Sequence, residues 1–227
     1  MSHKSRSGNS NPGHRVKLHA HGADQVRQHV CAEAARIMAE EGVSDFHSAK
    51  RKAAARLGLP ETKHLPSNEE VHQALQQHLR LFHATRTSQD GQRLRQLAAE
   101  AMRFLAKFEP RLVGPVLSGA VTPGAEIQLH LTADTPEEVG FWLDEHGISH
   151  ELTERRLRFG DDRHEVFPAY RFTADNAVVE LSIFTQRQAR EAPLSPVDSK
   201  PMKRANLKEV EMLLASGPSA PLVFDAS

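Results

Sequence analysis

The hydrophobic pattern of this chain changes its period at Pro110, and that change limits what the chain can fold into. Before Pro110, apolar side chains recur about every 3.6 residues, which is typical of amphipathic helices. After it, apolar and polar side chains alternate with a period of about 2, which is typical of half-buried strands. Helices followed by strands predict an α+β fold, with an N-terminal helical region and a small mixed β-sheet domain.

The same pattern divides the chain into segments. We expect a disordered basic tail (1–22), a helical region (23–109), a sheet domain (110–186), a Pro-rich loop with a C-terminal helix (187–216) and a frayed tail (217–227). Strands are predicted at 111–117, 126–131, 148–158, 165–173 and 177–184. A capping box at Ser67 and Glu70 predicts the start of the third helix, and a polar turn at 87–91 should precede the fourth. Thr135 is the expected N-cap of a short helix over 135–146.

Composition excludes several classes of protein. A single cysteine, Cys31, rules out a disulfide framework within the chain and fits a reducing compartment. No apolar run approaches the roughly 18–20 residues that a membrane span needs, so we expect no membrane partner. The N-terminal residues lack the apolar core of a secretory signal, and we expect a cytoplasmic protein. The phosphate-binding P-loop motif, the GxSxG nucleophile motif and the HExxH metal motif are all absent.

Two strands of the second half carry carboxylates among their apolar residues. In the earlier strand, alternation places Glu126 and Gln128 on one face. In the later strand, the same rule places Glu180 and Ser182 opposite the apolar residues. If these two strands pair, Glu126, Gln128 and Glu180 gather on a single face of the sheet.

Together with the preceding Ser118 and Gly119, these residues resemble the nucleotidyltransferase superfamily of the DNA polymerase beta type. The resemblance covers roughly residues 94–184. In that family a small turn holds a nucleoside triphosphate, and three carboxylates bind divalent metal, usually Mg²⁺, for in-line attack on the α-phosphorus. It implies a sheet domain of nucleotidyltransferase-like type, with Ser118 and Gly119 as the phosphate turn. Glu126, Gln128 and Glu180 would be the catalytic positions, and Glu126 and Glu180 the Mg²⁺ ligands.

Departures from the family pattern weaken the expected chemistry. Gln128 supplies a neutral amide where a second carboxylate is usual, and an amide is a poorer ligand for a hard cation. The Ser-Gly order is reversed, and only six residues separate Gly119 from Glu126. We therefore expect a divergent member that binds a nucleoside triphosphate or RNA and whose Mg²⁺-dependent transfer is doubtful or lost. Lys200, Lys203 and Arg204, in the Pro-rich loop, are further candidates for contacts with phosphate.

Other interpretations stay open. Residues 1–63 hold 11 Lys and Arg against 6 Asp and Glu, an excess of +5. A non-enzymatic adaptor is therefore the main alternative, binding nucleic acid or a protein through the basic helix that carries Lys50, Arg51, Lys52 and Arg56. A weaker alternative is a metal-dependent hydrolase that uses His146, His150, His164, Asp161 and Asp162. Finally, Glu126 and Gln128 could be the solvated face of an ordinary antiparallel strand.

Overall fold

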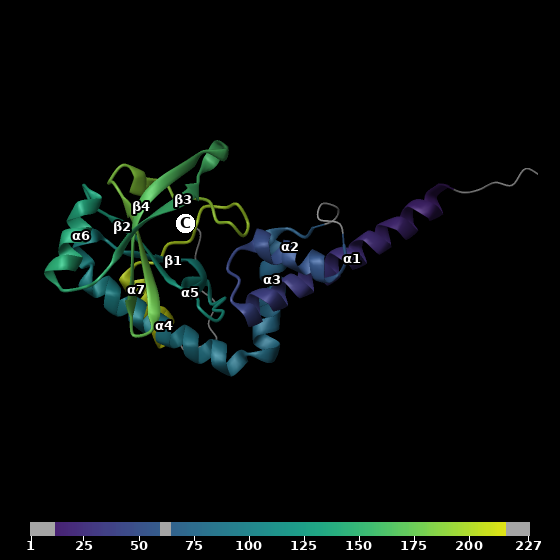
Figure 1. Cartoon of the computed structure of the whole chain (residues 1–227), viewed down its shortest axis with the longest axis horizontal. Helices are drawn as coiled ribbons and strands as arrows, with labels where there is room; N and C mark the ends of the chain where they lie inside the picture. Colours follow the sequence, from purple (N-terminus) through teal and green to yellow (C-terminus); the bar gives the residue numbers. More distant parts are fainter. Residues whose placement is uncertain (1–11, 60–64, 217–227) are drawn as a thin grey trace, which may run out of the picture.

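The computed structural model describes residues 12–59 and 65–216 of the chain. Within them the chain forms seven α-helices and a five-stranded mixed sheet, so the expected combination of helices with a mixed sheet is confirmed. Figure 1 shows a helical part at one end and the sheet with its covering helices at the other. Two separate clusters of buried apolar side chains underlie these two parts.

The helical part consists of α1 (Pro12–Glu41), α2 (Phe46–Arg56) and α3 (Asn68–Phe82). The capping box predicted at Ser67 and Glu70 is present at the start of α3, and Asp45 caps α2 through the amide of Ser48. The apolar faces of the three helices meet in one cluster that includes Val30, Ala34, Ile37, Ala53, Val71 and Leu75.

Helix α1 begins at Pro12, earlier than the expected start at Ala23. Proline suits the first turn of a helix because its missing N–H has no intrahelical partner there, and no second proline interrupts α1. The helix therefore extends into the segment that was expected to be a tail. The rest of that segment, 1–11, and the C-terminal segment 217–227 lie outside the described residues.

Helix α4 (Ala84–Phe104) runs without interruption through 87–91, so the polar turn expected there is wrong. The chain changes direction at His83 instead, and one glycine inside a helix costs only about 1 kcal/mol, which leaves α4 intact. Leu94 and Met102 of α4 pack into the core of the sheet. The two hydrophobic cores therefore separate near His83, whereas the period of the sequence changes later, at Pro110.

The sheet has the strand order β1-β2-β5-β4-β3. Its strands are β1 (Arg111–Val113), β2 (Ile127–Thr132), β3 (Glu151–Arg158), β4 (His164–Ala174) and β5 (Ala177–Phe184). Strands β2 and β5 are parallel, and every other neighbouring pair is antiparallel. The last four predicted strands are confirmed apart from small shifts at their ends.

The first predicted strand is too long. Only Arg111–Val113 is extended, and the chain then turns into the short helix α5 (Gly114–Ser118). Gly114 has a φ of 73°, a left-handed conformation that glycine adopts readily, and Pro115 follows in the first turn of the helix. β1 and β2 therefore form an antiparallel pair whose connection contains a helix.

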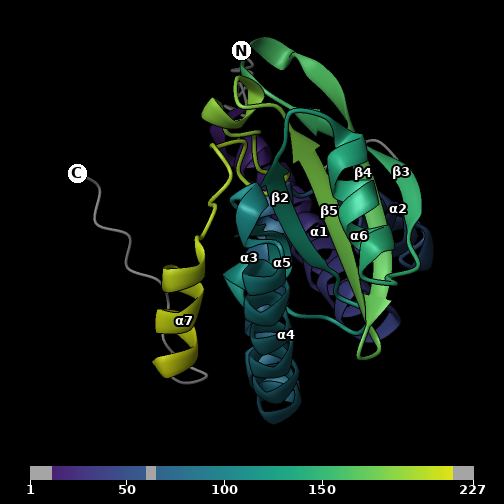
Figure 2. The same cartoon turned by 90° about the vertical axis from the view of Figure 1, so that its left-hand side faces the viewer.

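Helices cover one face of the sheet. Figure 2 shows α4 and α6 (Pro136–Glu145) in front of the strands, with α7 (Leu207–Ala215) beside α4. Ile127, Leu129 and Leu131 point into this layer and are buried. Thr135 precedes α6 as expected, but its side chain makes no capping hydrogen bond. None of the described helices combines the length and apolar character that crossing a membrane would require.

The opposite face of the sheet is crossed by the segment between β5 and α7. The amide of Leu194 donates to the carbonyl of Arg158 at 2.6 Å, and Ala205 pairs with Leu112 on β1. The side-chain amide of Asn68, at the start of α3, donates to the carbonyl of Pro196 at 2.6 Å. This segment thus joins both edges of the sheet to the helical part, and the polar side chains of β2 and β5 lie on the face that it crosses.

Candidate functional site

The parallel pairing of β2 and β5 confirms that two of the predicted positions, Gln128 and Glu180, share a face, while Glu126 lies just before β2. Gln128 lies opposite Glu180 in register, and His130 lies opposite Ser182. The antiparallel pairing of β4 with β5 places Arg171 on the other side of Glu180. Because side chains alternate between the faces of a sheet, all of these residues project to the face opposite α4 and α6.

Arginines from the same sheet already pair with both carboxylates. The Glu180 carboxylate lies 3.6 Å from the guanidinium of Arg155 on β3, and the Glu126 carboxylate accepts a hydrogen bond from Arg171. The Glu180 side chain is only 12 % exposed. Burial raises the pKa of its carboxyl, more than the charges of Arg155 and Arg171 lower it. Two carboxylates, two guanidiniums and the amide of Gln128 therefore form a cluster with no formal net charge.

This cluster does not suit a divalent cation. Magnesium binds through carboxylate oxygens whose negative charge is not already satisfied, and here each carboxylate has its own arginine. Across the described ranges, no three His, Cys, Asp or Glu side chains come together as a metal-binding group. The proposed ligands Glu126 and Glu180 share a face, but their surroundings do not fit the Mg²⁺ site that the resemblance implies.

The predicted phosphate turn lies at the far end of α5 from β1. Ser118 is the last residue of that helix, and its hydroxyl donates to the carbonyl of Pro115 at 3.3 Å. Gly119 ends the helix with a φ of 79°, and its amide also donates to Pro115. The carbonyl end of a helix carries partial negative charge, which disfavours a phosphate.

Gly114 is the residue that the sequence reasoning missed. It follows β1 directly and approaches the side chain of Gln128 so closely that a Cβ on Gly114 would overlap the Gln128 Oε1 atom. The structure therefore brings Gly114, and not Ser118 or Gly119, against the acidic strand. The Gly-Pro pair in the sequence could have indicated this, because such a pair breaks a strand and favours the start of a helix.

The three basic candidates of the Pro-rich loop have different environments. Lys200 is exposed at a tight turn, where its backbone amide donates to Asp198. Lys203 is exposed as well. Arg204 alone reaches a pocket against the sheet, and its guanidinium donates to the carbonyl of Ala189 at 2.8 Å.

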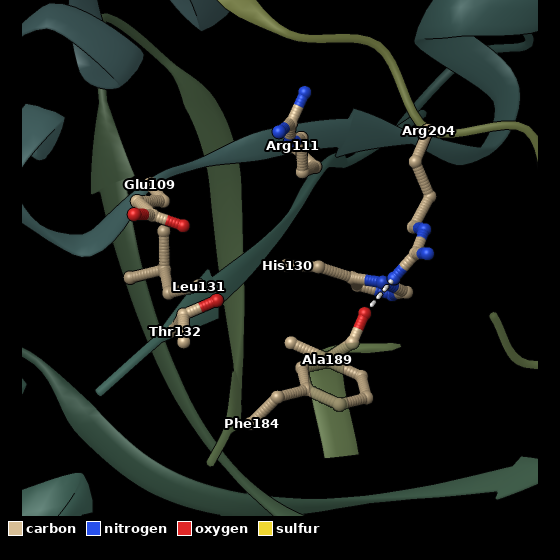
Figure 3. A pocket seen from close by; sticks show the side chains of 8 residues that line it. All are labelled: Glu109, Arg111, His130, Leu131, Thr132, Phe184, Ala189 and Arg204. Carbon is tan, nitrogen blue, oxygen red and sulfur yellow. Dashed lines mark hydrogen bonds between the residues drawn. The ribbon is translucent and has the colours of Figure 1, made fainter. Parts of the chain in front are cut away.

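That pocket adjoins the acidic cluster on the same face and has a volume of about 220 Å³. It is lined by Glu109, Arg111, His130, Leu131, Thr132, Phe184, Ala189 and Arg204. Figure 3 shows Arg204 reaching down beside the imidazole of His130, with Phe184 below and Arg111 above. His130 follows Gln128 on the same face of β2, so the pocket begins where the cluster ends and lies at the carboxyl ends of the two parallel strands. In α/β sheets, ligands bind at this end of the strands.

The basic residues of α2 mostly serve the helical part itself. The Lys50 ammonium donates to Asn68 Oδ1 at 2.7 Å, and Lys52 contacts the Glu41 carboxylate at 2.5 Å. Arg56 reaches the same Glu41 carboxylate at 2.7 Å. Arg51 lies exposed on the same helix. Intramolecular contacts thus account for much of the positive charge that the adaptor interpretation would assign to nucleic acid.

The histidines of the hydrolase interpretation do not assemble. His150 precedes β3, whereas His164 pairs with Arg158 at the other end of that strand. Seven steps of a strand span about 23 Å, so these two imidazoles cannot share a metal ion. The His146 Nδ1 atom lies 2.7 Å from the carbonyl of Trp142 in α6, while Asp161 and Asp162 belong to the turn that precedes β4. The predicted metal site is therefore wrong for the described residues.

No family model, curated protein or solved structure matches this chain.

Proposed function

We propose that this chain is a divergent nucleotidyltransferase-like protein that binds a nucleotide or an RNA and has lost Mg²⁺-dependent nucleotidyl transfer. The observation that carries the proposal is the pairing of Glu180 with Arg155 and of Glu126 with Arg171. These pairs occupy the positions at which the resemblance implies a metal-binding triad, and Gln128 completes the cluster without adding charge.

The paired arginines account for the loss of chemistry. A metal ion in phosphoryl transfer bridges phosphate oxygens, offsets developing charge and lowers the pKa of an attacking group that it binds. A guanidinium offers charge and hydrogen bonds, but it cannot coordinate an attacking oxygen. Arg155 and Arg171 can therefore keep the acidic strand folded and neutral without supplying the catalytic step.

Binding is supported by the positive charge next to the cluster. Arg111 and Arg204 line the adjoining pocket, and neither has a carboxylate within 4.0 Å among the described residues. Arginine recognises phosphate through paired, charge-assisted hydrogen bonds. A phosphate-bearing ligand would therefore find a cationic site on this face that requires no metal ion.

The proposal is tested by titrating ATP, CTP, GTP and UTP into the protein by calorimetry, first in EDTA and then in Mg²⁺. We expect binding under both conditions with similar affinity. Glu126→Gln and Glu180→Gln should bind no more weakly than wild type, because neither carboxylate would hold a metal. Parallel assays with α-labelled triphosphates and an RNA acceptor should give no product. Binding that requires Mg²⁺ and disappears in both variants, or label transfer by wild type, would contradict the proposal.

A further inference from the structure

The pocket beside the acidic cluster is built from segments far apart in the sequence. Arg111 comes from β1 and His130 from β2, while Ala189 and Arg204 come from the segment that crosses the sheet between β5 and α7. The pairing of Ala205 with Leu112 fixes Arg204 next to β1, with hydrogen bonds of 2.8 and 2.9 Å between the two backbones. Both arginines are therefore held at the pocket by the same isolated β-bridge.

Two guanidiniums and one carboxylate, that of Glu109, line the pocket, which leaves an excess of one positive charge. Burial lowers the pKa of Arg204, and the neighbouring charge of Arg111 lowers it further, which means that the two guanidiniums repel one another. Glu109 also lines the pocket, but among the described residues its carboxylate lies within 4.0 Å of neither guanidinium. Two like charges held close together by this bridge are stabilised by an anion that contacts both.

His130 adds a polar group without adding charge. The residue is 6 % exposed, and its Nδ1 atom has no hydrogen-bond partner among the described residues. Burial lowers the pKa of its imidazole to about 3, with the charges of Arg204 and Arg155 acting in the same direction. The ring is therefore neutral at physiological pH and can donate one hydrogen bond to an oxygen atom. Phe184, whose ring centroid lies 4.7 Å from that of His130, closes the apolar side of the pocket.

Volume limits what can enter. The pocket holds about 220 Å³, which corresponds to roughly seven waters at about 30 Å³ each. Pockets that enclose a whole drug-sized ligand measure about 300–1,000 Å³. A single phosphate group fits this space, whereas a nucleoside with its phosphates does not. The rest of a larger ligand would extend outward over the face of the sheet.

We infer that this pocket is a binding site for one terminal phosphate group, with Arg111 and Arg204 as its charge partners and His130 as a neutral hydrogen-bond donor. The inference rests on the proposed function for its ligand class, a nucleotide or an RNA that ends in a phosphate monoester. A monoester carries close to two negative charges at neutral pH, so each guanidinium can pair with one of its oxygens.

The test is a calorimetric titration in EDTA with three probes: inorganic phosphate, AMP and adenosine. We expect phosphate and AMP to bind and adenosine not to bind. Arg111→Gln and Arg204→Gln should each weaken AMP binding by about tenfold or more, as expected when one charge-assisted hydrogen bond is lost. Arg187→Gln is the matched control, because Arg187 is an exposed arginine of the same crossing segment outside the pocket. Its affinity for AMP should equal that of wild type.

Two further comparisons keep the inference testable. Arg111→Lys retains the charge and should recover part of the affinity lost in Arg111→Gln, even if the glutamine variant proves less stable. A short RNA with a 5′-phosphate should bind more tightly than the same RNA with a 5′-hydroxyl if the natural source of the phosphate is an RNA end, and both should bind equally weakly if it is a free nucleotide.

Failure of the inference can be told apart from failure of the proposed function. Adenosine binding as tightly as AMP, or AMP binding unchanged in Arg111→Gln and Arg204→Gln, overturns the phosphate site even if ATP binds elsewhere on the sheet. Binding of inorganic phosphate that is lost in both variants supports the site, even if none of the four nucleoside triphosphates binds.

Discussion

Gln128 on β2 stands directly opposite Glu180 on β5, in parallel strands whose register places both side chains on the face opposite α4 and α6. One member of the pair is a neutral amide, and the other is a largely buried carboxylate beside Arg155. The predictions about metal binding on this face depend on that relationship, because it decides how much negative charge a cation would meet there.

Placing a carboxylate at position 128 should create a cation site. In Gln128→Glu, a third carboxylate of nearly the same shape joins Glu126 and Glu180 at the cluster. We expect the affinity for Mn²⁺ to rise by about tenfold or more, because hard cations prefer carboxylate oxygens to amides. Titration followed by the electron paramagnetic resonance signal of free Mn²⁺ measures the change. Gln128→Met is the neutral control of similar length, and an equal rise in both variants would show that charge is not the cause.

Removing the cation beside Glu180 should destabilise the fold. In Arg155→Met the stem of the side chain is kept and the guanidinium is lost, so the pKa of Glu180 rises further and its buried carboxyl loses the ion pair with Arg155. We expect a loss of about 1–3 kcal/mol in the free energy of unfolding, measured with urea.

Arg103→Met serves as the control for that experiment. Arg103 and Glu211 form an exposed pair at 2.6 Å, with 53 % and 45 % of their side chains accessible. Pairs of that kind contribute less than about 1 kcal/mol. Equal losses in Arg103→Met and Arg155→Met would mean that the Glu180 pair acts as an ordinary surface ion pair.

The buried imidazole of His130 should make stability depend on pH. Its folded pKa is about 3, well below the value of 6.5 expected without burial. As the pH falls below 6.5, the unfolded chain therefore takes up a proton that the folded chain resists, and stability declines until the pH reaches about 3. The slope should reach about 1.4 kcal/mol per pH unit for this one group.

Urea unfolding of wild type and His130→Gln between about pH 7 and about pH 5 isolates that contribution. Other carboxylates and histidines titrate in both proteins, so only the difference between them reports on His130. The charges of Arg204 and Arg155 oppose protonation of the ring. As the pH falls, the free energy of unfolding of wild type should decrease more than that of His130→Gln. Parallel curves would contradict the buried, neutral imidazole.

Gly114 should tolerate alanine less well than a comparable glycine. Gly114 and Gly124 have φ angles of 73° and 77°, so alanine suffers about 1–2 kcal/mol of backbone strain at either position. At Gly114 the new Cβ also overlaps Gln128 Oε1, whereas at Gly124 no atom lies within 4 Å. Gly114→Ala should therefore lower the thermal midpoint more than Gly124→Ala does. Adding Gln128→Ala to Gly114→Ala should raise the thermal midpoint to about that of Gly124→Ala. If the midpoint does not rise, the overlap with Gln128 is not the cause of the extra loss.

The sequence predicts the sheet better than it predicts the site. Alternation in the predicted strands places Glu126, Gln128 and Glu180 on one face. The parallel pairing confirms this for Gln128 and Glu180, and Glu126, just before β2, contacts Arg171. The strand predicted at 111–117 is wrong because a short apolar run fits a strand or a helix equally well, and Gly114 and Pro115 decide between them. The polar residues at 87–91 are tolerated within α4 because the helix is held by its apolar face on the sheet.

The site was predicted less well than the sheet because its residues have partners on other strands. Arg155 and Arg171 belong to strands whose pairing depends on register, so their contacts with Glu180 and Glu126 cannot be read from spacing along the chain. Arg111 and Arg204 meet only because Ala205 pairs with Leu112. Sequence reasoning proposed Arg204 as a phosphate ligand but had no signal that would bring Arg111 or His130 beside it.

We conclude that the acidic face holds no catalytic metal. Nuclear magnetic resonance spectra of the free protein test this directly, because bound Mn²⁺ broadens the backbone amide signals of nearby residues. Mn²⁺ bound between Glu126 and Glu180 would selectively broaden the amides of neighbouring residues such as Gln128 and Ser182. We predict no selective broadening there in wild type and clear broadening in Gln128→Glu. Strong, saturable broadening of these amides in wild type would contradict this conclusion and would favour a metal-dependent enzyme instead.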